Sequence, residues 1–242
     1  MGSTLRMESR RIATLGTIRV LALAAVLLGT AAAAFVAATD PPGALSGDTA
    51  TAVLTGAGSM SLLPLTGLLV VLIGVTSVLE DTQHRLATVL LVAQPRRTTL
   101  AGARLTVLAS ITGGICLLLT VLTFLTAQLL GRPIGAGQVP DVFVAHLVTL
   151  VLLCWAGAAL GWLTGTAAVP VGLVLLDVLL VEPLSALAAS TYSPGLEELS
   201  VYLPFTAARD ATGGDPAALA TTCAYTAVLL TASALRITHR DY

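Results

Sequence analysis

The sequence contains no lysine, and all 12 of its basic residues are arginines. A nucleotide-binding P-loop of the form GxxxxGK[ST] needs a lysine that contacts the terminal phosphates, so this chain cannot build one. We therefore expect that the chain cannot hydrolyse ATP alone. Any process driven by ATP would need a separate ATPase subunit.

Charged residues of any kind are scarce. They make up 10% of the 242 residues, whereas hydrophobic residues make up 56%, and a soluble domain is about a quarter charged. The mean hydropathy is +0.93. These values are typical of an all-α protein that crosses a membrane several times. The net charge of −1 argues against nucleic acid binding, which needs a basic surface.

Metal-binding and redox motifs are missing as well. The three cysteines lie inside apolar runs without a CxxC spacing, so we expect buried free thiols. They are Cys116, Cys154 and Cys223. The three histidines, His84, His146 and His239, are scattered along the chain, whereas a metal site needs several ligands that converge. The sequence therefore predicts no metal site and argues against an intramembrane protease.

Apolar runs long enough for transmembrane helices recur along the chain. A bilayer core about 30 Å thick is crossed by about 20 helical residues. The charge-free stretch 142–176 is too long for one crossing, and we expect a break at "GTAAVP" (165–170), because Pro170 suits the first turn of a new helix. We predict one membrane domain over residues 1–242, with six spans at about 20–39, 59–79, 105–130, 142–165, 169–189 and 216–235.

The arginines predict an orientation. With six spans, ten of the twelve lie on one side, and only Arg132 and Arg209 lie opposite. Loops rich in arginine stay cytoplasmic, so both termini are predicted to be cytoplasmic. Leu5 and Ile12 stand among the N-terminal arginines, which predicts a helix at the membrane surface before Val20. An ordinary basic tail is the alternative.

Charges reappear abruptly in "SVLEDTQHRLATVLLVAQPRRTT" (77–99). Its apolar run is too short to span a membrane, yet several of its residues share one helical face. We predict a cytoplasmic helix over 80–97 that docks into a groove on a partner. A plain connector with snorkelling arginines is the alternative. The residues assigned to docking are Glu80, Arg85, Leu86, Leu90, Pro95, Arg96 and Arg97.

The arrangement resembles the permease subunit of a type-2 ATP-binding-cassette (ABC) exporter, in the bacterial drug- and antibiotic-export branch. The residues that carry the resemblance are Glu80, Thr88, Pro95-Arg96-Arg97 and Arg104. The family usually has a lysine at the position of Arg104 and a glycine at that of Ala87. The resemblance implies a coupling helix between spans two and three, and a path for an amphipathic drug, antibiotic or lipid-like molecule.

The same resemblance implies that the chain is a transport subunit, which is no enzyme and binds no cofactor of its own, and it implies the partners of the chain. Two ABC ATPase subunits would bind ATP and Mg beneath the membrane, and a second permease copy or a paralogue would complete the path. The location would be the bacterial plasma membrane. Short helices would also lie in the outer leaflet before the sixth span, where Leu196, Leu199 and Leu203 are spaced as on one helical face between Pro194 and Pro204.

Two acids lie inside the predicted fifth span, where an ionised carboxylate is costly. Asp177 and Glu182 are five residues apart, which in an α-helix places them about 140° apart, so we expect no carboxylate dyad. Either acid could line the transport path or make a structural hydrogen bond. If Asp177 carries protons, the chain would instead be a proton-coupled secondary transporter, which is the alternative function.

Three glycines in the fourth span predict close helix packing. Gly157, Gly161 and Gly165 are spaced by four residues, and small residues at this spacing let two helix backbones approach each other. The pattern leaves open whether the neighbouring helix belongs to the same chain or to a second copy.

Overall fold

The computed structural model describes residues 2–40, 43–45, 47–56, 65–83, 97–192 and 201–239. Within these ranges the chain is helical and has one isolated parallel β-bridge, between Leu45 and Ile134. The all-α prediction is therefore confirmed for this part of the chain. The helices are α1 (Gly2–Thr14), α2 (Gly16–Thr39), α3 (Gly47–Thr55), α4 (Leu65–Gln83), α6 (Arg97–Leu129), α7 (Val139–Thr164), α8 (Ala168–Leu176), the π-helix η1 (Asp177–Val181), α9 (Glu182–Tyr192), α11 (Pro204–Thr212) and α12 (Pro216–His239).

Several helices have the length and composition of membrane spans. Five stretches qualify among the described residues, and the apolar part of α4, Leu65–Leu79, is shorter. The five are Gly16–Thr39, Thr99–Leu129, Val139–Thr164, Ala168–Ser185 and Pro216–Ile237. These are the features of a multi-pass membrane protein. The second span was predicted at 59–79; residues 57–64 lie outside the described ranges, and α4 runs from Leu65 to Gln83.

The long apolar stretch after residue 142 is divided between two helices. α7 ends at Thr164, and Gly165 follows in the left-handed conformation (φ 70°, ψ 4°), its N–H bonded to the Gly161 carbonyl. A left-handed residue at this position favours glycine because a Cβ would clash. α8 begins at Ala168, so Pro170 lies in its first turn, where the missing N–H breaks no intrahelical bond.

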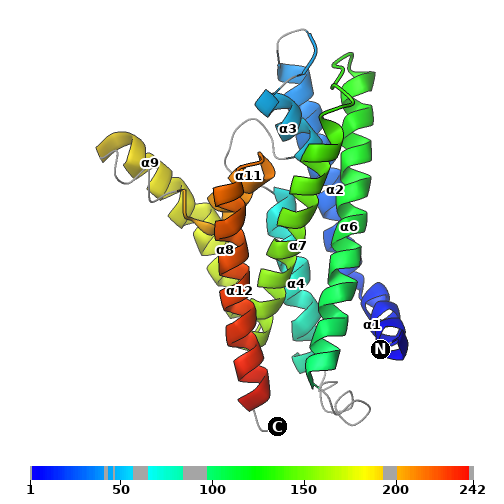
Figure 1. Cartoon of the computed structure of the whole chain (residues 1–242), viewed down its shortest axis with the longest axis vertical. Helices are drawn as coiled ribbons and strands as arrows, with labels where there is room; N and C mark the ends of the chain where they lie inside the picture. The colour runs from blue at the N-terminus through cyan, green and yellow to red at the C-terminus, as the bar shows by residue number, and fades with distance from the viewer. Residues whose placement is uncertain are drawn as a thin grey trace.

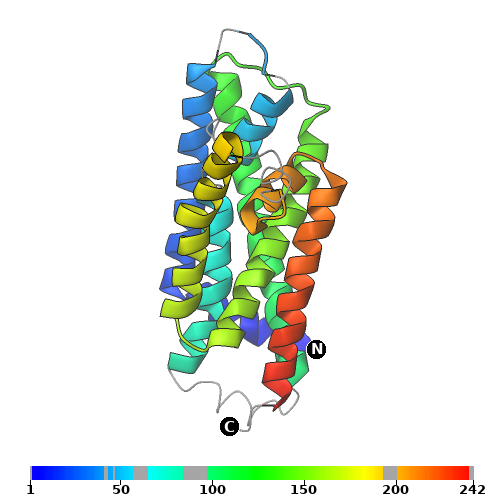
Figure 2. The same cartoon turned by 90° about the vertical axis from the view of Figure 1, so that its left-hand side faces the viewer.

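The bundle has two distinct ends (Figures 1 and 2). α1, the end of α4, the start of α6 and the end of α12 lie together at one end, which we name the α1 end. α3 and α11 lie at the opposite end, the α3 end, with the end of α6 and the start of α7. The two described termini of the chain are therefore on the same side of the bundle.

The core centres on α7, which packs against α4, α6, α11 and α12. The α8–η1–α9 segment is less covered, and α9 extends away from the bundle (Figure 1). Leucines along this segment are half or more exposed, among them Leu176, Leu179 and Leu187. In a membrane protein such an apolar surface faces lipid or another subunit.

Candidate functional site

The predicted docking segment is described only at its two ends. Glu80 lies in the last turn of α4, and Arg97 is the first residue of α6. Arg85, Leu86, Leu90, Pro95 and Arg96 lie outside the described residues. The helices place both ends of the segment at the α1 end of the bundle (Figure 1).

A buried ion pair joins α1 to the first turns of α6. Arg104 Nη2 lies 3.3 Å from Glu8 Oε1, and the two residues are 3% and 0% exposed. Arg11 Nη1 lies 3.5 Å from the same carboxylate oxygen. Thr4, Glu8 and Ile12, spaced by four, form the buried face of α1. Charge burial of this kind is tolerated only when the charges are paired.

The role of Glu8 was not predicted, although the sequence contains a signal for it. Glu8 is the first acidic residue of the chain, and the next is Asp40. An isolated acid on the apolar face of an arginine-rich helix needs a partner. The sequence does not reveal that this partner is Arg104, 96 residues away.

The prediction that Asp177 and Glu182 point 140° apart is wrong. It assumed an α-helix, but residues Asp177–Val181 form a π-helix, and the Glu182 N–H bonds to the Asp177 carbonyl five residues back. The two acids are therefore separated by about one wider turn and lie on neighbouring faces. The wider turn changes which side chains share a face.

Glu182 supports the N-terminus of α11. Its Oε1 accepts hydrogen bonds from the backbone N–H groups of Phe205 (2.7 Å) and Thr206 (3.0 Å). The N-cap residue, Leu203, offers no side-chain acceptor, and Pro204 occupies the first turn. A carboxylate at this position satisfies free N–H groups and opposes the positive end of the helix dipole. Pro204 thus begins a helix, whereas most of the short helix predicted between Pro194 and Pro204 lies outside the described residues.

Replacing Glu182 with alanine is expected to loosen α11 by about 1–2 kcal/mol, because two N–H groups lose a charged acceptor. Hydrogen exchange of the Phe205 and Thr206 amides should then accelerate roughly 5- to 30-fold. The control is Glu182→Gln, whose amide oxygen still accepts, and its exchange should stay close to wild type. Equal exchange in the alanine variant and the wild type would contradict this role.

The glycines of α7 lie against α4 of the same chain. A Cβ on Gly157 would stand 2.2 Å from the Val71 carbonyl oxygen, and one on Gly161 would stand 3.1 Å from that of Val75. The opposing glycine is Gly74, whose Cβ would stand 2.1 Å from the Cys154 carbonyl oxygen. Gly165 differs, because it caps α7. Close backbone contact between α4 and α7 therefore depends on glycines from both helices.

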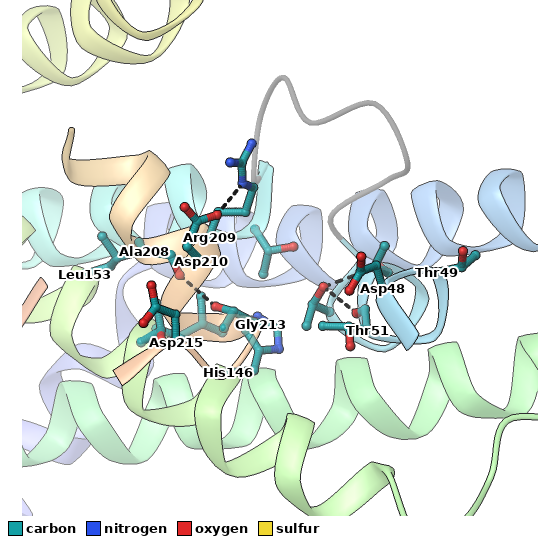
Figure 3. A pocket seen from close by; sticks show the side chains of 17 residues that line it. Asp48, Thr49, Thr51, His146, Leu153, Ala208, Arg209, Asp210, Gly213 and Asp215 are labelled. Atoms are coloured by element: carbon teal, nitrogen blue, oxygen red, sulfur yellow. Dashed lines mark hydrogen bonds and ion pairs between the residues drawn. The ribbon is translucent and has the colours of Figure 1, made fainter. Parts of the chain in front are cut away.

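A cavity of about 680 Å³ opens between α3, the start of α4, α7 and α11. Figure 3 shows His146 of α7 directed into the space between α3 and α11. Gly213 and Asp215 also line the cavity. Exposed residues such as Asp48 and Asp215 lie at its mouth, and buried residues such as Thr66 and Leu153 form its floor. No pattern in the sequence pointed to this cavity, because its walls come from four separate segments.

Among the described residues, no group of three or more His, Cys, Asp or Glu side chains could hold a metal ion.

A scan against models of known protein families and a search of the curated proteins both found no match to this chain.

Proposed function

We propose that this chain is the transmembrane subunit of an ATP-driven exporter of the type-2 ABC class, with six spans and both termini in the cytoplasm of a bacterial cell. Two copies, or this chain and a paralogue, form a path for an amphipathic small molecule. Separate ATPase subunits bind ATP and Mg and dock against the segment 80–97. The α1 end is then the cytoplasmic end.

The observation that carries this proposal is the Glu8–Arg104 ion pair. Arg104 lies about two helical turns after Arg97, the last residue of the docking segment. Because both residues belong to α6, a displacement of the segment also moves Arg104. In this proposal α1 lies at the membrane surface, and the buried pair passes the displacement to it. A transmembrane subunit that is coupled to cytoplasmic ATPases needs a rigid link between α1 and α6, because closure of the ATPases must move these helices as a unit.

The second candidate function is proton-coupled transport, and Asp177 favours it. The carboxylate is half-buried on a π-helix, a distortion found frequently at functional sites. Among the described residues it has no hydrogen-bond partner for its side chain. An acid in this position could bind a proton or cationic cargo.

Energy dependence separates the two functions. Inside-out vesicles from cells that express the chain with its native neighbouring proteins should accumulate a fluorescent cationic drug when ATP is added. A non-hydrolysable ATP analogue should give no uptake, whereas a protonophore should leave ATP-driven uptake nearly unchanged, because the energy comes from the ATPase partner. Vesicles with the Asp177→Asn variant should still take up the drug only when ATP is added.

The opposite pattern would overturn the exporter proposal. Uptake without ATP, abolished by a protonophore and by Asp177→Asn, would identify a proton-coupled carrier. Glu182→Gln is the matched control, because it removes the neighbouring charge while it keeps an acceptor for α11.

A further inference from the structure

The floor of the cavity at the α3 end carries polar atoms without partners. Nδ1 of His146 and Oγ1 of Thr66 are buried and have no hydrogen-bond partner in the part of the chain that the structure describes. The residues are 4% and 2% exposed. Buried polar groups are almost always hydrogen-bonded. Thr66 Oγ1 faces α2, because a Cβ on Gly29 would stand 3.0 Å from it. The His146 side chain is instead directed into the cavity (Figure 3), so a molecule inside the cavity can supply its missing partner.

The mouth of the same cavity is acidic. Its lining contains three aspartates, Asp48, Asp210 and Asp215, and one arginine, Arg209, which gives a formal charge of −2 (three negative minus one positive) with His146 neutral. Arg209 is itself paired with Asp210, Nε to Oδ1 at 3.0 Å. The field at the mouth therefore attracts cations and repels anions.

The walls between floor and mouth are mainly apolar. Ala52, Leu150, Leu153 and Ala208 contribute to them. A volume of about 680 Å³ lies within the range of sites for drug-sized molecules, about 300–1,000 Å³. An apolar body would therefore fit beneath a charged group held at the mouth.

We propose that this cavity binds a small amphipathic organic cation. The positive group lies at the mouth near Asp48, Asp210 and Asp215, the apolar body fills the middle, and a polar group at the inner end bonds with His146 Nδ1. The site lies within a single chain, so it needs neither a second copy nor an ATPase. If the ATP-driven exporter proposal fails, the binding site stands, and the reverse also holds.

The charge preference is tested with two probes of nearly equal size and opposite charge. The purified chain in a non-ionic detergent, free of lipid, is titrated with tetraphenylphosphonium and with tetraphenylborate, against empty micelles as the blank. The cation should bind and the anion should not. At low salt, Asp48→Asn should weaken cation binding about three- to tenfold, because one charge near the ligand is removed.

Asp141→Asn is the matched control for this experiment. Asp141 lies in the first turn of α7 at the same end but outside the cavity lining, so its loss should leave the affinity unchanged. Equal binding of cation and anion, or an equal loss in both variants, would overturn the proposed site.

The inner polar contact is tested with ethidium, a cation with amino groups. His146→Phe keeps a ring but removes Nδ1, and should weaken ethidium binding about tenfold. His146→Asn, which returns a polar atom near the Nδ1 position, should restore much of the affinity. Tetraphenylphosphonium has no hydrogen-bonding group and should bind all three forms alike. Ethidium binding that is the same in all three would show that only water meets His146, and would overturn the inner contact.

Discussion

Gly157→Ala is expected to destabilise the protein severely, although it adds one methyl group in the middle of a helix. The new Cβ would stand 2.2 Å from the Val71 carbonyl oxygen, and the obstacle is backbone, which cannot rotate away. α4 and α7 must separate, and the packing around them is lost. Overpacking costs about 1–3 kcal/mol when side chains can adjust, so we expect about 3 kcal/mol or more here. The midpoint of thermal unfolding should fall by roughly 6–12 °C.

Gly74→Ala should have a similar effect from the other side of the same contact, because its Cβ would meet the Cys154 carbonyl oxygen at 2.1 Å. The double variant should lose less than the sum of the two, since one substitution already forces the helices apart. Unfolding can be followed with a thiol-reactive dye, because Cys116 and Cys154 are buried and react only when the helices separate. Cys223 is exposed, so the prediction of a buried thiol is wrong there, and it reacts in the folded protein as well.

Gly114→Ala is the control for both variants. Gly114 lies in α6, and a Cβ there would meet nothing within 4 Å. Its replacement should be neutral, or stabilising by about 0.5–1 kcal/mol through helix propensity. If all three alanine variants unfold at the wild-type temperature, the α4–α7 contact does not depend on its glycines.

The second large effect is expected for Glu8→Ala. It leaves the guanidinium of Arg104, a residue 3% exposed, without the carboxylate 3.3 Å away. Removing one partner of a buried pair costs about 3–5 kcal/mol, because the remaining charge is poorly solvated. The loss of stability cannot exceed the free energy with which α1 binds to the bundle. If the cost is larger, α1 detaches and water reaches Arg104. Hydrogen exchange should therefore accelerate along the whole of α1.

Two further variants separate charge from packing. Glu8→Leu combined with Arg104→Met replaces the pair with apolar side chains and should recover much of the stability lost by Glu8→Ala. Arg11→Ala removes a more exposed partner, with 16% of its side chain accessible, and should cost less than about 1 kcal/mol. A double variant as unstable as Glu8→Ala would contradict the explanation by the lost carboxylate of Glu8.

The sequence by itself determined the features that depend on local composition. The scarcity of charge and the length of the apolar runs predict helices that span a membrane, and the structure has five stretches of this kind. Gly165 and Pro170 mark the change from α7 to α8. Glycine permits the left-handed conformation that ends α7, and proline restricts φ to a value that suits the first turn of α8, so neither effect depends on distant residues.

Only the tertiary structure decided which side chains meet. The π-helix at Asp177–Val181 moved Asp177 and Glu182 onto neighbouring faces, and a helical wheel drawn at α-helical spacing cannot anticipate it. Gly74 gained its importance from the backbone of Cys154 in α7, and Glu8 from Arg104, residues far apart in the chain. The cavity around His146 needs four segments at once. Apolar helices have many faces of similar composition, so the sequence predicts that they pack but not which faces do so.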